Sequence, residues 1–276
     1  MLTPGNCIPS NVGGVSPRFW RSRLPHARIP LAIGIAAATV LLGITVAHAT
    51  VTESVDFTIK VSKADKNKRF GGLTVRTVFN VRDDAGVKPI PLTKTTLRFP
   101  KGAKVNAKFF KKCSRSALEA KGPSGCPAAS KIGAGSAIGD ARPIIADVKT
   151  KITMFNGQPA NGNPTILIYA VPDISSPLTI QAELKRQRSG PYGYVLEADV
   201  PTIPTLPGQP NASVTFFDAT TLDKTVKRKG RTVHYIEGPI VCNGTYLLLD
   251  GVFSYEGGIT HTVYEKFTIK GGPRCP

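Results

Sequence analysis

The chain has 276 residues, 41% of them hydrophobic, and carries 36 Lys and Arg against 18 Asp and Glu, for a net charge of +18. This apolar fraction supplies a real core, so the composition excludes a chain without a folded domain and fits one or two domains. The excess of positive charge favours association with polyanions.

The first 49 residues have the three-part layout of a secretory signal. Four arginines and no acidic residue precede an apolar run from Ile29 to Val46, and Ala47 and Ala49 follow at the positions that a signal peptidase reads. The alternative is a signal anchor, because a run of 18 apolar residues lies at the lower edge of a bilayer span. We therefore expect residues 1–49 to be a signal peptide or signal anchor, and residues 50–276 to be a secreted or extracytoplasmic domain.

Beyond Thr50 the dominant pattern is the alternation of apolar and polar residues that is typical of strands. Turn residues such as Asn156-Gly157 and Gly257-Gly258 separate the alternating segments. Many short strands without long helical patterns predict an all-β fold, an antiparallel β-sandwich or jelly roll. The predicted strands are 55–61, 73–81, 95–99, 148–155, 165–171, 178–184, 194–200, 213–220, 232–236, 246–255 and 259–269.

One short helix interrupts this pattern. Ser116 followed three residues later by Glu119 has the form of a capping box, and Gly122-Pro123 would end the helix, so we expect it over 117–121. Further along, four prolines recur at every third residue between Pro201 and Pro210, which fits a polyproline II segment. A stiff connector between two strands is favoured there over a docking ligand.

Cysteine usage agrees with export. Cys7 lies in the leader, which leaves Cys113, Cys126, Cys242 and Cys275 in the exported part. Four cysteines allow three pairings, and proximity along the chain favours Cys113 with Cys126 and Cys242 with Cys275. A metal site would need close pairs at C-x2-C spacing, which the sequence lacks.

Several blocks of the sequence resemble one family of exported proteins of high-GC Gram-positive bacteria. They are LRFPKGAKVNAKFF, CSRSALEAKGPSGCPAASKIG, NGQPANGNPTILIYAVP and PTIPTLPGQPNASVTFFDAT, and together they span most of the exported part. The resemblance implies an exported β protein. It brings no activity and no functional residue with it.

Catalytic motifs are missing from the sequence. The exported part has two histidines, His234 and His261, and neither belongs to a nucleophile elbow, an S-x-x-K or an H-E-x-x-H motif. No cofactor or metal is therefore expected. Glu197 and Asp199 would point to the same face of one strand, which leaves a polysaccharide hydrolase with these two carboxylates as the alternative.

Positive charge is concentrated in three predicted loops. With four arginines in the leader, the exported part keeps 32 basic and 18 acidic side chains, a net charge of +14. We expect a non-enzymatic structural or binding module that attaches to an anionic envelope polymer or membrane surface, mainly through Lys108, Lys111, Lys112, Lys227, Arg228 and Lys229. Nucleic acid is not an expected partner, because the leader directs the protein out of the cell. The loops hold Lys63, Lys66, Lys68 and Arg69; Lys101, Lys104, Lys108, Lys111, Lys112 and Arg115; and Lys224, Lys227, Arg228, Lys229 and Arg231.

Overall fold

The computed structural model describes residues 51–65, 70–239 and 247–267. The chain divides into two units, Met1–Val46 and Ala47–Pro276, and all described residues belong to the second. The leader and both Cys242 and Cys275 lie outside the described residues, so their predicted roles stay predictions.

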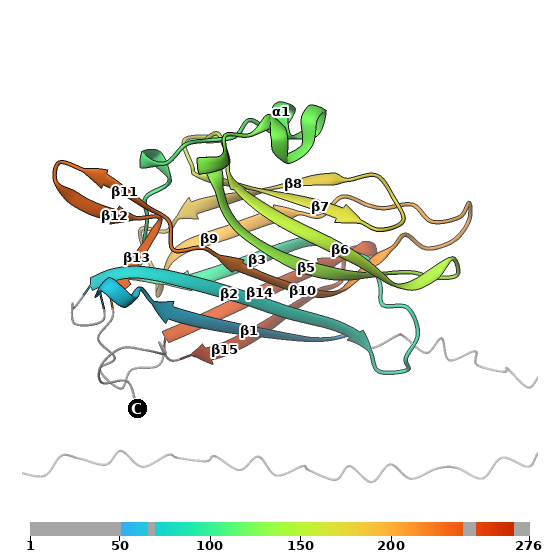
Figure 1. The fold of residues 1–276 in the computed structure, drawn as a ribbon. Helices are drawn as coiled ribbons and strands as arrows, with labels where there is room; N and C mark the ends of the chain where they lie inside the picture. Colours follow the sequence, from blue (N-terminus) through green and yellow to red (C-terminus); the bar gives the residue numbers. More distant parts are fainter. Residues whose placement is uncertain (1–50, 66–69, 240–246, 268–276) are drawn as a thin grey trace, which may run out of the picture. The chain divides into compact units, whose positions relative to one another are not determined.

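The described residues are mostly β-strand, as the sequence predicts (Figure 1). One helix, α1 (Arg115–Lys121), and five short 3-10 turns, η1 (Lys63–Asp65), η2 (Ala107–Phe109), η3 (Gly122–Gly125), η4 (Ala128–Ser130) and η5 (Glu256–Gly258), complete the fold. The strands are β1 (Val51–Val61), β2 (Phe70–Asp83), β3 (Leu92–Pro100), β4 (Lys104–Val105), β5 (Lys131–Ala141), β6 (Ile145–Asn156), β7 (Thr165–Pro172), β8 (Leu178–Arg186), β9 (Tyr192–Asp199), β10 (Ser213–Thr221), β11 (Thr225–Arg228), β12 (Arg231–His234), β13 (Ile236–Pro239), β14 (Leu247–Tyr255) and β15 (Thr260–Phe267).

Thirteen of these strands form one antiparallel sheet in the order β15-β14-β3-β9-β8-β7-β6-β5-β10-β2-β13-β4, with β1 also paired to β2. The sheet curves until β1 lies beside β15 (Figure 1). Glu53 of β1 contacts both strands of the last hairpin: it accepts a hydrogen bond from the hydroxyl of Tyr255 in β14 at 2.5 Å and lies 2.8 Å from Nδ1 of His261 in β15. The all-β antiparallel prediction is confirmed, and the strands belong to one continuous curved sheet.

Inward-facing apolar side chains fill the region between the facing parts of the sheet. Near β1, β2 and β14 the core contains three aromatic rings: Phe79 stacks on Phe217 at 4.9 Å and meets the edge of Phe253 at 5.5 Å. The alternation in the sequence is thus the pattern of a sheet with one buried face.

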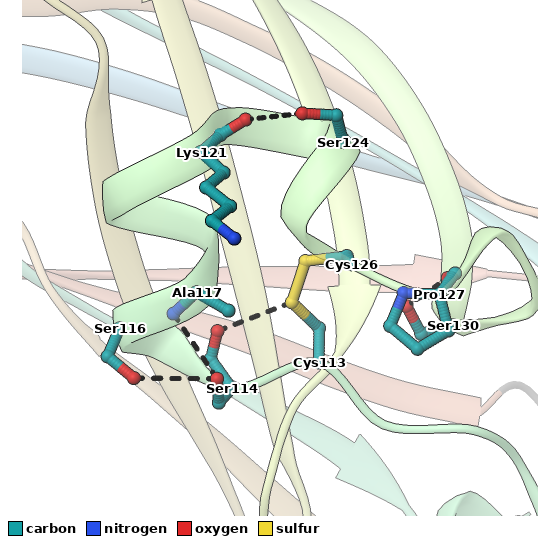
Figure 2. Close-up of a disulfide and its surroundings, with 9 residues drawn as sticks. All are labelled: Cys113, Ser114, Ser116, Ala117, Lys121, Ser124, Cys126, Pro127 and Ser130. Carbon is teal, nitrogen blue, oxygen red and sulfur yellow. Dashed lines mark hydrogen bonds between the residues drawn. A yellow bond between two sulfur atoms is a disulfide. The ribbon is translucent and has the colours of Figure 1, made fainter.

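Helix α1 packs on the outer face of the sheet and is fixed there by a disulfide. Leu118 of α1 lies in a small apolar cluster with Phe155 and Leu167, which point outward from β6 and β7. The predicted Cys113–Cys126 bond is confirmed, with 5.0 Å between the Cα atoms (Figure 2). The disulfide therefore closes the loop that carries α1.

The cap of this helix differs from the prediction. Ser114 is the N-cap, and its Oγ accepts a hydrogen bond from the amide of Ala117 at 3.2 Å (Figure 2). Glu119 does not complete a capping box with Ser116; it binds the Arg115 side chain at 2.7 Å. The helix consequently begins at Arg115, two residues earlier than the pattern at Ser116 indicates.

Candidate functional site

Non-local strand pairing brings the three basic loops to one end of the sheet. The short strand β13 pairs with Phe70–Gly72 at the start of β2, directly after the first loop, and also with β4 in the second loop. The third loop is the β11–β12 hairpin, which leads into β13. We call this region the basic end, defined by Lys63, Lys104, Lys108, Lys111, Lys112, Lys224, Lys227, Arg228, Lys229 and Arg231.

Two aromatic rings join the basic loops to one another. The Lys108 ammonium lies 5.0 Å and the Arg228 guanidinium 5.2 Å from the centre of the Phe109 ring, so side chains from the second and third loops share one ring. Lys104 lies 5.0 Å from the ring of Phe70, which stands at the end of the first loop. Cations above aromatic faces are held by the ring quadrupole, which fixes these charges in place while leaving them accessible.

Of the six predicted polyanion-binding residues, Lys108 and Arg228 meet at the Phe109 ring, Lys227 and Lys229 flank Arg228 in the hairpin, and Lys111 and Lys112 follow Lys108 in the second loop. Five of them are exposed and Lys112 is half-buried. None of the six forms an ion pair with a residue that the structure describes. Lys227 donates to the Thr232 hydroxyl at 2.8 Å across the hairpin, a contact that leaves its charge uncompensated.

His234 lies beneath the basic end and is not exposed to solvent as a catalytic base would be. It is buried, with Nε2 at 2.9 Å from Asp65 Oδ2 and Nδ1 at 2.6 Å from Asp223 Oδ1. Both ring nitrogens therefore lie within hydrogen-bond distance of a carboxylate oxygen. The network ties the end of β12 to η1 and to the chain before β11. His261 lies at the β15 edge against Glu53.

The two carboxylates of the alternative hydrolase reading lie on the outer face of β9. Glu197 is 2.9 Å from the Lys185 ammonium and 3.2 Å from that of Lys94, whereas Asp199 is exposed at the strand end. The hydrogen bond from Lys185, supported by Lys94 and opposed by burial, lowers the pKa of Glu197. A general acid needs the opposite shift, so this geometry describes a carboxylate in an ion-pair network.

Replacing Glu197 by Gln is expected to reduce stability at neutral pH by about 1 kcal/mol, since two partly exposed ion pairs are lost. Because folding lowers the pKa of Glu197, its contribution is present above the pKa of the unfolded chain and disappears as the pH falls through the folded value. Melting temperatures of the two proteins should therefore converge in acid. A difference that persists at low pH would contradict this reading, and a polysaccharide turnover that E197Q abolishes would support the hydrolase instead.

One polar cluster on the same face was not foreseen from the sequence. Asp250 of β14 is buried and accepts hydrogen bonds from the Tyr192 hydroxyl at 2.5 Å and from Arg98 at 3.3 Å. The hydrogen bond to Asp250, with burial, raises the pKa of Tyr192 to about 12. A single aspartate within the apolar stretch LLLDGVF was the only available signal.

Among the described residues, no cluster of His, Cys, Asp and Glu could hold a metal ion. The described part of the chain also contains no helix long and apolar enough to cross a membrane. Comparison with family models, curated proteins and solved structures finds no match to this chain. Its function has to be argued from the surfaces and cavities themselves.

Proposed function

We propose that the protein is a non-enzymatic, exported binding module that attaches to an anionic envelope polymer through its basic end. The main support for the proposal is that Lys108 and Arg228, which come from separate loops, both lie against the Phe109 ring. Charges from the two loops thereby form one surface. A combined surface attracts a polyanion more strongly than the same charges dispersed over the molecule.

Three further features support export and binding. The leader has the layout of a secretory signal, and the Cys113–Cys126 disulfide is typical of oxidising compartments outside the cytoplasm. The cations of the basic end are accessible, whereas Glu197 of the hydrolase alternative is engaged by two lysines. Binding therefore fits the described geometry better than catalysis.

The test is co-sedimentation of the exported domain with an anionic polymer at low and high salt. Retention should be strong at low salt and weak at high salt, because mobile ions screen such contacts over roughly 8 Å at physiological ionic strength. The double variant K227Q/R228Q should bind about 30-fold more weakly, from about 1 kcal/mol per cation near an anionic surface.

The matched control is K149Q/K151Q, which removes the same charge from exposed positions on β6. It should bind like the wild-type domain. Equal losses in the two double variants would show that net charge alone matters and that the basic end is not a site. Retention that is absent at low salt, or unchanged at high salt, would also overturn the proposal, and anionic vesicles in place of the polymer show whether a lipid surface serves equally well.

A further inference from the structure

The curved sheet encloses a cavity of about 670 Å³ between its facing strands. This volume is within the range of small-molecule sites, roughly 300 to 1,000 Å³. The lining is predominantly apolar, with many aliphatic side chains, and comes from most strands of the sheet. It includes Val75, Ile138, Ile152, Ile168, Ile180 and Leu196.

Several inward-facing side chains of this lining are incompletely buried. Ile166 and Ile168 of β7 and Leu196 of β9 line the cavity and remain half-exposed, although their neighbours in the same layer are fully buried. Protein interiors are normally packed as densely as organic crystals, so aliphatic groups that face empty space lose dispersion contacts. An apolar ligand in the cavity would restore those contacts.

We place the entrance of the cavity at the β5–β6 and β7–β8 connections, because exposed apolar residues of both connections belong to its lining. Ile144 and Ile145, in the β5–β6 connection, are 53% and 42% exposed, and Ile174, in the β7–β8 connection, is 50% exposed. All three also line the cavity. Single exposed apolar residues are ordinary, but three isoleucines around one opening form an apolar entrance.

The chemistry of the lining identifies the class of ligand. A polar ligand would lose its hydrogen bonds to water and find few partners among these side chains, which costs several kcal/mol per group. A flexible aliphatic chain has no hydrogen bonds to water to lose, and it can bend to follow an irregular space. We propose that the cavity binds a long acyl chain, of a free fatty acid or of a membrane lipid, that enters past Ile144, Ile145 and Ile174. The lining reaches Val105 of β4 and Ile236 of β13 beneath the basic end, but the binding of an acyl chain does not depend on the proposed function.

The first test titrates the exported domain with a fluorescent long-chain fatty acid and then with saturated fatty acids of increasing length as competitors. Binding should saturate at one site. Each added methylene should tighten it up to about four-fold, which corresponds to about 0.8 kcal/mol, until the chain fills the cavity. Transfer of a fluorescent phospholipid from vesicles, measured in parallel, distinguishes a membrane lipid from a free fatty acid. No saturable binding of either probe would overturn the proposal.

Ala137→Phe places a ring in the cavity, because Ala137 lines it from β5. Ala134→Phe is the matched control: Ala134 lies on the same strand, three residues earlier, on the exposed face. The first variant should bind the fatty acid at least about tenfold more weakly and the second should bind normally. Equal binding by the two variants would contradict a ligand in this cavity.

A second variant tests the proposal even if the Ala137→Phe protein does not fold. Ile144→Asp with Ile174→Asp changes only exposed side chains at the entrance, so the fold should be retained, as checked by circular dichroism and by unchanged polymer binding. Uptake of the fatty acid should slow several-fold. Unchanged uptake would show that the chain does not enter at this opening and would refute the proposed route.

Discussion

Replacing His234 by Ala is expected to lower the free energy of unfolding by about 3 kcal/mol, because a buried ring is lost and the buried carboxylate of Asp65 loses a hydrogen-bond partner. The substitution removes the ring that lies between Asp65, which is 2% exposed, and Asp223. Asp65 keeps a hydrogen bond from the amide of Gly72, at 2.9 Å, so part of its network survives. Chemical denaturation at neutral pH measures the change.

Two variants sharpen this prediction. Gly72→Ala should also be destabilising, since a Cβ there would lie 2.1 Å from Nδ1 of His234 and would displace the ring without removing it. His261→Ala should cost less, because that ring is at the rim and Glu53 keeps the Tyr255 hydroxyl. An H234A protein within about 1 kcal/mol of wild type, or no more affected than H261A, would contradict a structural role for the His234 network.

The local patterns of the sequence predicted most of the strands. The alternation of apolar and polar residues determines which face of a strand is buried, so segments such as β1 and β7 were recognisable without their partners. The final hairpin was also predicted, since Gly257 and Gly258 adopt the positive φ angles that its turn requires.

Strand β5 was missed because its sequence, KIGAGSAIGDA, is rich in glycine, which has low strand propensity. The glycines are explained by packing between strands. A Cβ at Gly135 would lie 2.0 Å from the carbonyl oxygen of Asp218 in β10, and one at Gly133 would lie 2.2 Å from the Met154 side chain. Close approach of neighbouring strands requires glycine here, and this depends on partners far away in the sequence.

The candidate sites were predictable only in part, for the same reason. The sequence identified each basic loop, but their convergence depends on β13 pairing with both β2 and β4, which no local pattern records. The cavity is a similar case, because alternation indicates that Ile166 and Ile168 point inward but not that the curved sheet leaves space beside them. Curvature arises from the whole sheet, and a pattern along one strand does not determine it.

Replacing Asn156 by Ala should also lower the free energy of unfolding strongly, by about 3 kcal/mol or more. Asn156 is completely buried at the end of β6, where Nδ2 donates to the carbonyl oxygens of Ala107 at 3.1 Å and Lys111 at 3.0 Å, and Oδ1 accepts from the Tyr235 hydroxyl at 3.1 Å. Alanine leaves the two carbonyl oxygens and the Tyr235 hydroxyl without the Asn156 amide as a partner, which costs about 1–3 kcal/mol of stability for each buried group.

The same contacts hold the second basic loop against the sheet, so N156A should also weaken polymer binding, because Lys108, Lys111 and Lys112 lose their support. Tyr235→Phe removes one hydrogen bond of the network and should cost about 1–2 kcal/mol. Asn163→Ala is the matched control, since its amide donates to Glu183 at 2.7 Å in a less buried position and should cost less than about 1 kcal/mol. Denaturation curves and salt-dependent co-sedimentation of the three variants decide the matter. If N156A resembles N163A in both measurements, Asn156 does not organise the basic end.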